Sequence, residues 1–340
     1  MIVTRRFPIR LLLLIALRVG VVAALWAGVV FGAYMFLDLT FLRIPFLPIA
    51  TIGTAVAFYI GFKNNSAYDR FWEGRKIWGG IVNVSRSFAV AVGAYVDPTK
   101  SDAEALAARK DLIYRHLAWI NALRLQLRKT SRFLHNPAAS TKRRLEEHAD
   151  HMRNDWDTEL TPFLGADELA YISARQNGAT HLLDKQGREL ASLTENGRLD
   201  MFRQLELMSL VQEMFTLQGQ CERIKNTPLP RQYAELSRVF VRVFVVLIPF
   251  GMLDVFEGHQ GLSLATNIAN SALMIASSAL ISWVFMTMEG IGDSSEDPFE
   301  RSMNDVPMNA LCRTIEIDLR ELLGETELPE KEKPAGFVLY

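Results

Sequence analysis

The chain lacks the patterns that mark most enzymes and nucleic-acid-binding proteins. Its 340 residues include only two cysteines, Cys221 and Cys312, which are too widely spaced in sequence for a CxxC redox or metal pair. It contains no glycine-rich nucleotide loop and no GxSxG nucleophile motif. Its 37 basic and 38 acidic residues give a net charge of −1, whereas nucleic-acid binding requires a basic excess. These absences predict that the chain is not an enzyme and does not bind nucleic acid.

Two weaker candidates for chemistry remain in the sequence. Glu147, His148 and His151 could place metal ligands on one helical face, but the order is not HExxH and the flanks are rich in charge. We interpret this segment as a solvated helix face. Cys221 could be a reactive thiol, although a packed thiol is the favoured interpretation. We therefore expect no metal site and no resident cofactor.

Long apolar runs are what the sequence does have. A mean hydropathy of +0.10 together with 22% charged residues indicates membrane segments combined with a water-exposed part. Four candidate spans lie at residues 19–37, 44–62, 239–253 and 260–288. Nineteen helical residues cover about 30 Å, the thickness of the hydrocarbon core. The third run is the weakest, because Arg242 interrupts it.

The rest of the chain carries helical patterns and almost no strand alternation, so the predicted class is an all-α membrane protein with four transmembrane helices. The second membrane helix is expected to continue into the cytosol and to bend at Gly79-Gly80. The expected divisions are an N-terminal membrane hairpin, a cytosolic helical region, a second membrane hairpin and a cytosolic C-terminal segment, at 1–62, 63–234, 235–289 and 290–340.

The flanking charges predict an orientation. Basic residues follow both the N-terminus and the second span, whereas the loop at 254–259 contains no Lys or Arg. Since basic flanks stay on the cytoplasmic side, both termini and the large middle region are expected to be cytoplasmic.

The second span carries a residue stripe of interest. Thr54, Phe58 and Phe62 recur every fourth position and so share one face of a helix. Periodicity alone favours a stripe that faces lipid or a neighbouring helix, and a pore lining is the alternative. In a pore, the polar residues at the inner end of this helix would line a water-filled vestibule; they are Lys63, Asn64, Asn65 and Ser66.

Three segments resemble one known family. The sequence GFKNNSAYDRFWEGRKIWG at 61–79 is similar to the signature after the second membrane helix of bacterial bestrophin homologues. The segment from Cys221 through Thr227 and Pro230 to Tyr233 resembles the family's segment before the third helix, and 293–300 resembles its acidic segment. With the 2+2 arrangement of spans, the resemblance covers almost the whole chain.

The resemblance implies a homopentameric ion channel in the bacterial inner membrane, with one central pore. Its hydrophobic neck would consist of Thr54, Phe58 and Phe62, and Thr54 departs from the family's usual aliphatic residue. A second, cytosolic constriction would be formed by Met214 or, one turn earlier, by Leu210. The implied partners are other copies of the chain, the lipid bilayer and permeant monovalent ions.

Members of the family differ in whether they bind Ca²⁺ and in whether they conduct anions or cations. Eukaryotic members bind Ca²⁺ through an acidic run after the fourth helix, but here Ser294, Ser295 and Pro298 interrupt that run, so no Ca²⁺ site is expected. Eukaryotic relatives conduct anions such as chloride and some bacterial ones conduct monovalent cations, so both ion classes stay open.

Two further functions stay open as alternatives. One is a non-channel scaffold or receptor, whose second helix would not face a symmetry axis. The other is a secondary transporter, which predicts internal repeats and interrupted membrane helices. Pro249-x-Gly251 is the only interruption of that kind in the sequence.

Overall fold

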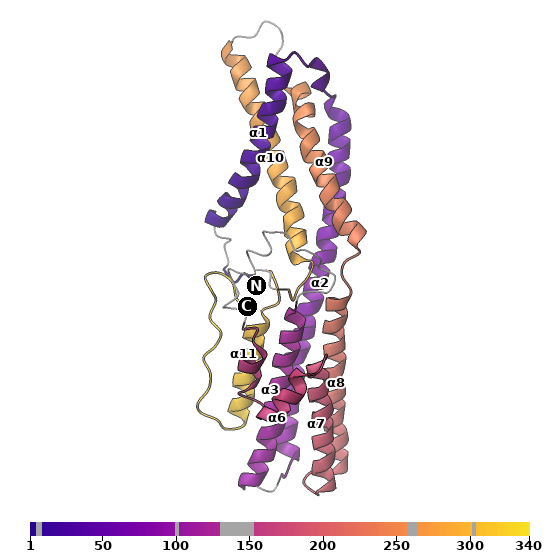
Figure 1. Cartoon of the computed structure of the whole chain (residues 1–340), viewed down its shortest axis with the longest axis vertical. Coiled ribbons are helices and arrows are strands. Elements are labelled where there is room, and N and C mark those ends of the chain that lie inside the picture. The colour runs from indigo at the N-terminus through magenta and orange to yellow at the C-terminus, as the bar shows by residue number, and fades with distance from the viewer. Residues whose placement is uncertain (5–8, 99–101, 130–152, 257–263, 301–303) are drawn as a thin grey trace. The chain divides into compact units, whose positions relative to one another are not determined.

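The computed structural model describes residues 1–4, 9–98, 102–129, 153–256, 264–300 and 304–340 (Figure 1). Within these ranges the chain is helical apart from loops and two isolated β-bridges, which confirms the predicted all-α class. The candidate metal ligands Glu147, His148 and His151 lie outside the described residues.

The described chain divides into two compact units. The membrane unit consists of Thr4–Asp69 and Leu229–Glu296. The large unit consists of Met1–Val3, Arg70–Pro228 and Asp297–Tyr340. The four-segment division expected from the sequence stays a prediction.

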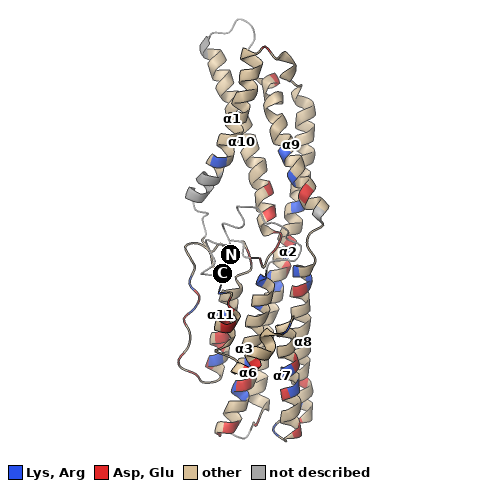
Figure 2. Cartoon of the chain, in the orientation of Figure 1, with Lys and Arg blue, Asp and Glu red and all other residues tan. Residues whose placement is uncertain are grey.

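Four long apolar helices define this chain as a multi-pass membrane protein. They are α1 (Ile9–Phe36), α2 (Phe46–Tyr95), α9 (Arg231–Val255) and α10 (Leu264–Ser295). All four are long and apolar enough to cross a bilayer, which confirms the four predicted spans. Figure 2 shows that the upper parts of these helices carry few charged residues.

The core of the membrane unit forms where α1, α2, α9 and α10 pack together. Its buried side chains include Val30, Ile49, Val56, Ile60, Phe244 and Met274. Small residues permit this packing: a Cβ at Gly53 would lie 2.5 Å from Cζ of Phe244, and one at Gly251 would lie 2.8 Å from Cδ1 of Ile49.

Helix α9 runs unbroken through Pro249, so the interruption that a transporter would use is absent from this helix. Arg242 does not break α9 either. It is exposed and lies about one turn from Arg238, which forms an ion pair with Asp293 at 2.9 Å.

Helix α2 is the longest element, with 50 residues. A single carboxylate secures its start, because Asp254 accepts the N–H of Phe46 at 3.1 Å and pairs with Arg43 at 2.9 Å. The 3-10 helix η1 (Thr40–Leu42) leads into this start. Gly79 and Gly80, where a bend was predicted, do not interrupt the helix: α2 continues through both residues. A Cβ at Gly80 would lie 2.9 Å from Cδ2 of Leu217, so this glycine permits close packing of α8.

The large unit is a helical bundle arranged around α3. Its helices, besides the second half of α2, are α3 (Ala103–Arg128), α5 (Trp156–Leu160), α6 (Ala166–Ser173), α7 (Gly178–Glu195), α8 (Met201–Asn226) and α11 (Met308–Leu322). Asp102 caps α3 by accepting the N–H of Ala105. Helix α3 packs against α7, α8 and α11.

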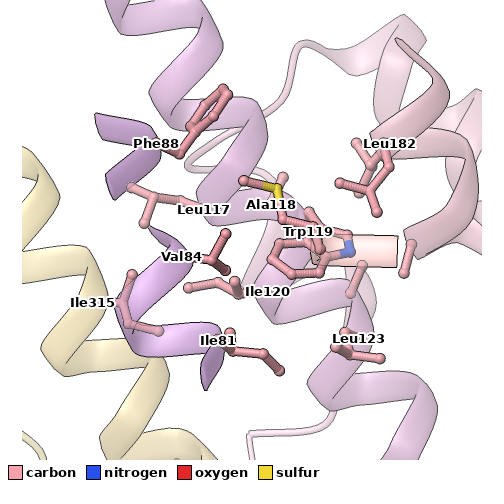
Figure 3. Close-up of a cluster of buried hydrophobic side chains, with 14 of the residues drawn as sticks. Ile81, Val84, Phe88, Leu117, Ala118, Trp119, Ile120, Leu123, Leu182 and Ile315 are labelled. Atoms are coloured by element: carbon pink, nitrogen blue, oxygen red, sulfur yellow. The ribbon is translucent and has the colours of Figure 1, made fainter. Parts of the chain in front are cut away.

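Trp119 of α3 is fully buried in the hydrophobic core of the large unit (Figure 3). Fully buried side chains from α2, α7 and α11 belong to the same core, among them Phe88, Leu182 and Ile315. Burying one such side chain contributes about 1.5–3 kcal/mol. The indole N–H of Trp119 has a partner inside this core, because it donates to Oε1 of Gln218 at 2.9 Å.

A buried ion pair ties α3 to α5 in the same unit. The guanidinium of Arg124 is almost fully buried and lies 2.6 Å from the carboxylate of Glu159. Arg124 also donates to Oδ1 of Asn309 at 2.7 Å. Because its charge and both of its terminal nitrogens find partners, Arg124 is tolerated in an otherwise apolar interior.

Both cysteines should be unreactive in the folded protein. Cys221 and Cys312 are free and buried, which confirms the interpretation of Cys221 as a packed thiol. Burial raises the pKa of the Cys221 thiol and raises that of Cys312 to about 11, so neither forms thiolate near neutral pH.

An aromatic disulfide reagent at pH 8 should detect no thiol in native protein and two after denaturation. Rapid labelling of native protein would contradict this prediction.

Candidate functional site

The candidate neck residues lie on the unpacked face of α2. Phe58 and Phe62 are each 67% exposed, and Thr54 is also exposed. Val56 and Ile60, which alternate with them on the other face, are 5% and 0% exposed. The phenylalanines therefore do not pack in the core of their own protomer. Large apolar side chains left uncovered in this way face lipid, a second subunit or a pore.

Thr54 differs from its two neighbours on the stripe in polarity. Its hydroxyl donates to the backbone carbonyl of Ala50 at 3.0 Å. Since the hydroxyl has a partner within the helix, Thr54 is less polar towards its surroundings than a free hydroxyl would be.

The four vestibule candidates at 63–66 separate into two pairs. The side chain of Lys63 is fully buried, and that of Asn64 donates to the carbonyl of Met288 at 3.0 Å. Asn65 and Ser66 are exposed on the side of α2 that carries the phenylalanines. Asn65 and Ser66 are therefore the exposed pair of the four.

The exposed stripe changes character along α2. Up to Phe62 it consists of Thr and apolar residues, and from Asn65 it is mostly polar. Its exposed members beyond the neck include Asn65, Asp69, Trp72, Lys76 and Asn83. Within the membrane unit the stripe thus passes from an apolar segment to the polar residues Asn65 and Asp69.

The two candidates for the cytosolic constriction are poorly exposed. Met214 is 0% exposed, and Leu210 is partly buried and packs against the core of the large unit. The first turns of α8 instead expose apolar side chains, of which Phe202 is 81% exposed. Sequence reasoning missed Phe202. The signal was Asp200, which caps α8 and so places Phe202 in the first turn.

A positively charged pocket lies between α2 and α11 in the large unit. It is lined by Arg75, Lys76, Gly79, Gly80, Val82, Asn83, Leu311 and Thr314. None of these residues is acidic, and Arg75 forms no ion pair with any described residue. The ammonium of Lys76 lies 5.9 Å from the ring centroid of Trp72. A pocket of this composition attracts anions.

Three acidic side chains of the segment at 293–300 have basic partners. Asp293 pairs with Arg238 in the membrane unit, and in the large unit Asp297 lies 3.6 Å from Arg70. Glu300 pairs with Lys225 at 2.5 Å. No group of three or more potential metal ligands occurs among the residues that the structure describes.

The comparisons with known proteins agree with this architecture. Four helices of membrane-spanning length and a large helical unit fit the class of bestrophin-like membrane proteins. Residues 3–321 match the family model described as bacterial/fungal bestrophin protein. The chain belongs to this bestrophin family, which confirms the resemblance drawn from its sequence.

Individual relatives and solved structures share a low sequence identity with this chain. The chain is 28% identical to the voltage-dependent anion channel-forming protein YneE of Escherichia coli K12, over 86% of this chain and 82% of that protein. It is 27% identical to the protein of the same description, mll4386, from Mesorhizobium japonicum, over 92% and 85%. A solved bacterial bestrophin homologue from Klebsiella pneumoniae shares the fold, with a TM-score of 0.74, 23% identity and coverage of 92% of this chain and 99% of that one.

Proposed function

We propose that the chain is the subunit of a homopentameric anion channel whose central pore is lined by α2. The exposure of Phe58 and Phe62 on an otherwise packed membrane helix is the observation that carries the proposal. Closed cyclic symmetry would turn one such stripe into rings of side chains around an axis. Membership in a family with channel-forming relatives points to a channel rather than an enzyme.

The neck acts as a hydrophobic gate in this proposal. An ion that enters a narrow ring of phenylalanine side chains loses hydration, and the ring provides no polar group in exchange. Rotation or withdrawal of Phe58 and Phe62 would admit water and lower that barrier. Thr54 forms the outermost ring, and Asn65 and Ser66 line the wider space beyond the inner end.

Two observations support anions over monovalent cations as the permeant ions. Relatives of this chain are named as anion channel-forming proteins. In addition, the pocket around Arg75 and Lys76 adjoins the exposed stripe of α2 and contains no carboxylate. Positive charge beside a conduction path raises the local concentration of anions. If the channel instead conducts monovalent cations, the reversal potential of its current should lie near the equilibrium potential of the permeant cation.

The cytosolic constriction is assigned to Phe202 in this proposal. Among the described residues of the large unit it is the most exposed large apolar side chain, whereas Met214 is enclosed in the protomer and Leu210 is half-covered. A side chain can narrow a pore only when it projects beyond its own subunit. Phe202→Ala should therefore alter conductance more than Met214→Leu, which leaves the outer surface unchanged.

Truncation of the neck phenylalanines tests the proposed function. In liposomes that contain a chloride gradient, the Phe58→Ala/Phe62→Ala variant should conduct about tenfold more than the unaltered protein, because a wider ring stays wet. Neither side chain fills the protomer core, so the loss of roughly 3–5 kcal/mol typical of Phe→Ala in a core is not expected. Native mass spectrometry should show a pentamer for both proteins.

The control for this experiment is Phe88→Ala, which removes a fully buried phenylalanine from the large unit and should lower stability without raising flux. Absence of flux from the unaltered protein would favour the scaffold or receptor function. An intact pentamer with unchanged flux in the double variant would remove the phenylalanines from the gate.

The proposed orientation places both termini and the large unit in the cytoplasm. A cysteine introduced at Thr40, in η1, should react in intact cells with an impermeant thiol reagent, whereas one at Asn196, after α7, should react only after lysis. Both positions are exposed, and the native cysteines are buried and give little background. The reverse labelling pattern would overturn the orientation.

We also propose that the acidic segment binds no Ca²⁺ tightly. Calcium sites use six to eight oxygen ligands with several carboxylates, and here Asp293, Asp297 and Glu300 already pair with basic side chains. Calorimetry should therefore detect no micromolar Ca²⁺ binding. Binding that disappears in Asp297→Ala would refute the proposal, and Glu330→Ala, a change in an exposed surface pair, is the matched control.

A further inference from the structure

A cluster of charged side chains joins three helices at the inner end of the membrane unit. The ammonium of Lys63 on α2 lies 2.9 Å from Glu289 and 3.5 Å from Asp293, one turn apart on α10. Asp293 also binds Arg238 of α9 at 2.9 Å, and Arg238 binds Glu235. We call these five residues the inner ion-pair cluster.

Lys63 is the enclosed member of this cluster. Its side chain is 0% exposed, compared with 11% for Glu289, 41% for Asp293 and 32% for Arg238. A buried ammonium without a carboxylate partner is strongly disfavoured, so Lys63 is stable only while α10 holds Glu289, and with it Asp293, against it. The position of α2 relative to α10 is therefore tightly specified at this point.

The adjacent residue reinforces the same contact between the two helices. Asn64 donates to the carbonyl of Met288 at 3.0 Å. A Cβ at Gly292 would collide with Oδ1 of Asn64, so α10 approaches α2 closely because position 292 is glycine. Two successive residues of α2 are thus fixed to one turn of α10.

This contact lies directly beside the proposed neck. Lys63 follows Phe62 in sequence, and successive residues of an α-helix point about 100° apart. When Lys63 points into the protein towards α10, Phe62 and, one turn earlier, Phe58 point to the exposed side. A rotation of α2 that withdraws the phenylalanines would also pull Lys63 away from Glu289.

We infer that Lys63 is a positioning residue of the neck: through Glu289 it sets the rotation of α2 and holds Phe58 and Phe62 in the closed ring. This inference rests on the proposed channel function. Lys63 has no contact with the permeating ion and acts only through α2. The inner ion-pair cluster therefore opposes opening, since rotation of the neck separates a buried pair from its partner.

The test compares removal of the pair with its reversal. Lys63→Met/Glu289→Met replaces the pair with apolar side chains of similar size, which proteins commonly tolerate. Flux of chloride into liposomes should rise about fivefold as the closed ring loses its restraint. Lys63→Glu/Glu289→Lys restores opposite charges across the same contact and should return flux towards the unaltered level.

A direct readout of the neck separates positioning from a merely structural role. A reporter cysteine at Phe58 should react at a different rate with a thiol reagent in the Met/Met background than in the otherwise unaltered chain. The matched control is Arg43→Met. This change removes the ion pair between Arg43 and Asp254, 2.9 Å apart, which lies near the start of α2, at the opposite end of its membrane segment. It should leave both flux and reporter labelling unchanged.

Each result bears on the inference separately from the channel proposal. An unaltered protein without flux contradicts the channel function itself. Where the unaltered protein conducts, a Met/Met variant that assembles with unchanged flux and unchanged labelling overturns the role of Lys63. Failure of both double variants to assemble would assign the cluster to folding alone and would overturn the inference as well.

Discussion

The packing of α2 on one face only is the constraint on which the rest of the structure depends. In the membrane unit its covered face meets α9 and α10, and glycine at position 53 permits the approach of Phe244. In the large unit the same helix contributes Phe88 to the core around Trp119. Because the covered face packs against other helices of the same protomer, only the side chains of the opposite face are exposed to contact molecules outside the protomer.

Charge in this protein is largely balanced where it is buried. Arg124 and Lys63 are the most enclosed cations of their units, and each lies within 3 Å of a carboxylate. Arg75 is different, because its pocket contains no acid and no described residue pairs with it. A cation that the protomer does not neutralise is available to mobile anions, and this is the physical basis for the proposed role of α2 of the large unit in ion selection.

Some site predictions depended on information that periodicity does not contain. The stripe formed by Thr54, Phe58 and Phe62 could be identified from spacing alone, because every fourth residue of a helix shares a face. Spacing could not show that Lys63 is buried and Asn65 exposed, since a polar residue at a helix end can face water or an acidic partner. Likewise nothing local marked Met214 as buried, because its neighbours in space come from other helices.

The sequence by itself determined the all-α class, the number of membrane spans and the family, because these follow from long apolar runs, helical periodicity and local motifs. Only the tertiary structure decided which side of each helix is covered. It left Phe58 exposed and enclosed Lys63 against Glu289. It also packed Leu217 of α8 so closely against Gly80 that a side chain there would collide with it. These outcomes depend on contacts between segments far apart in the chain, and such contacts leave no local pattern in the sequence.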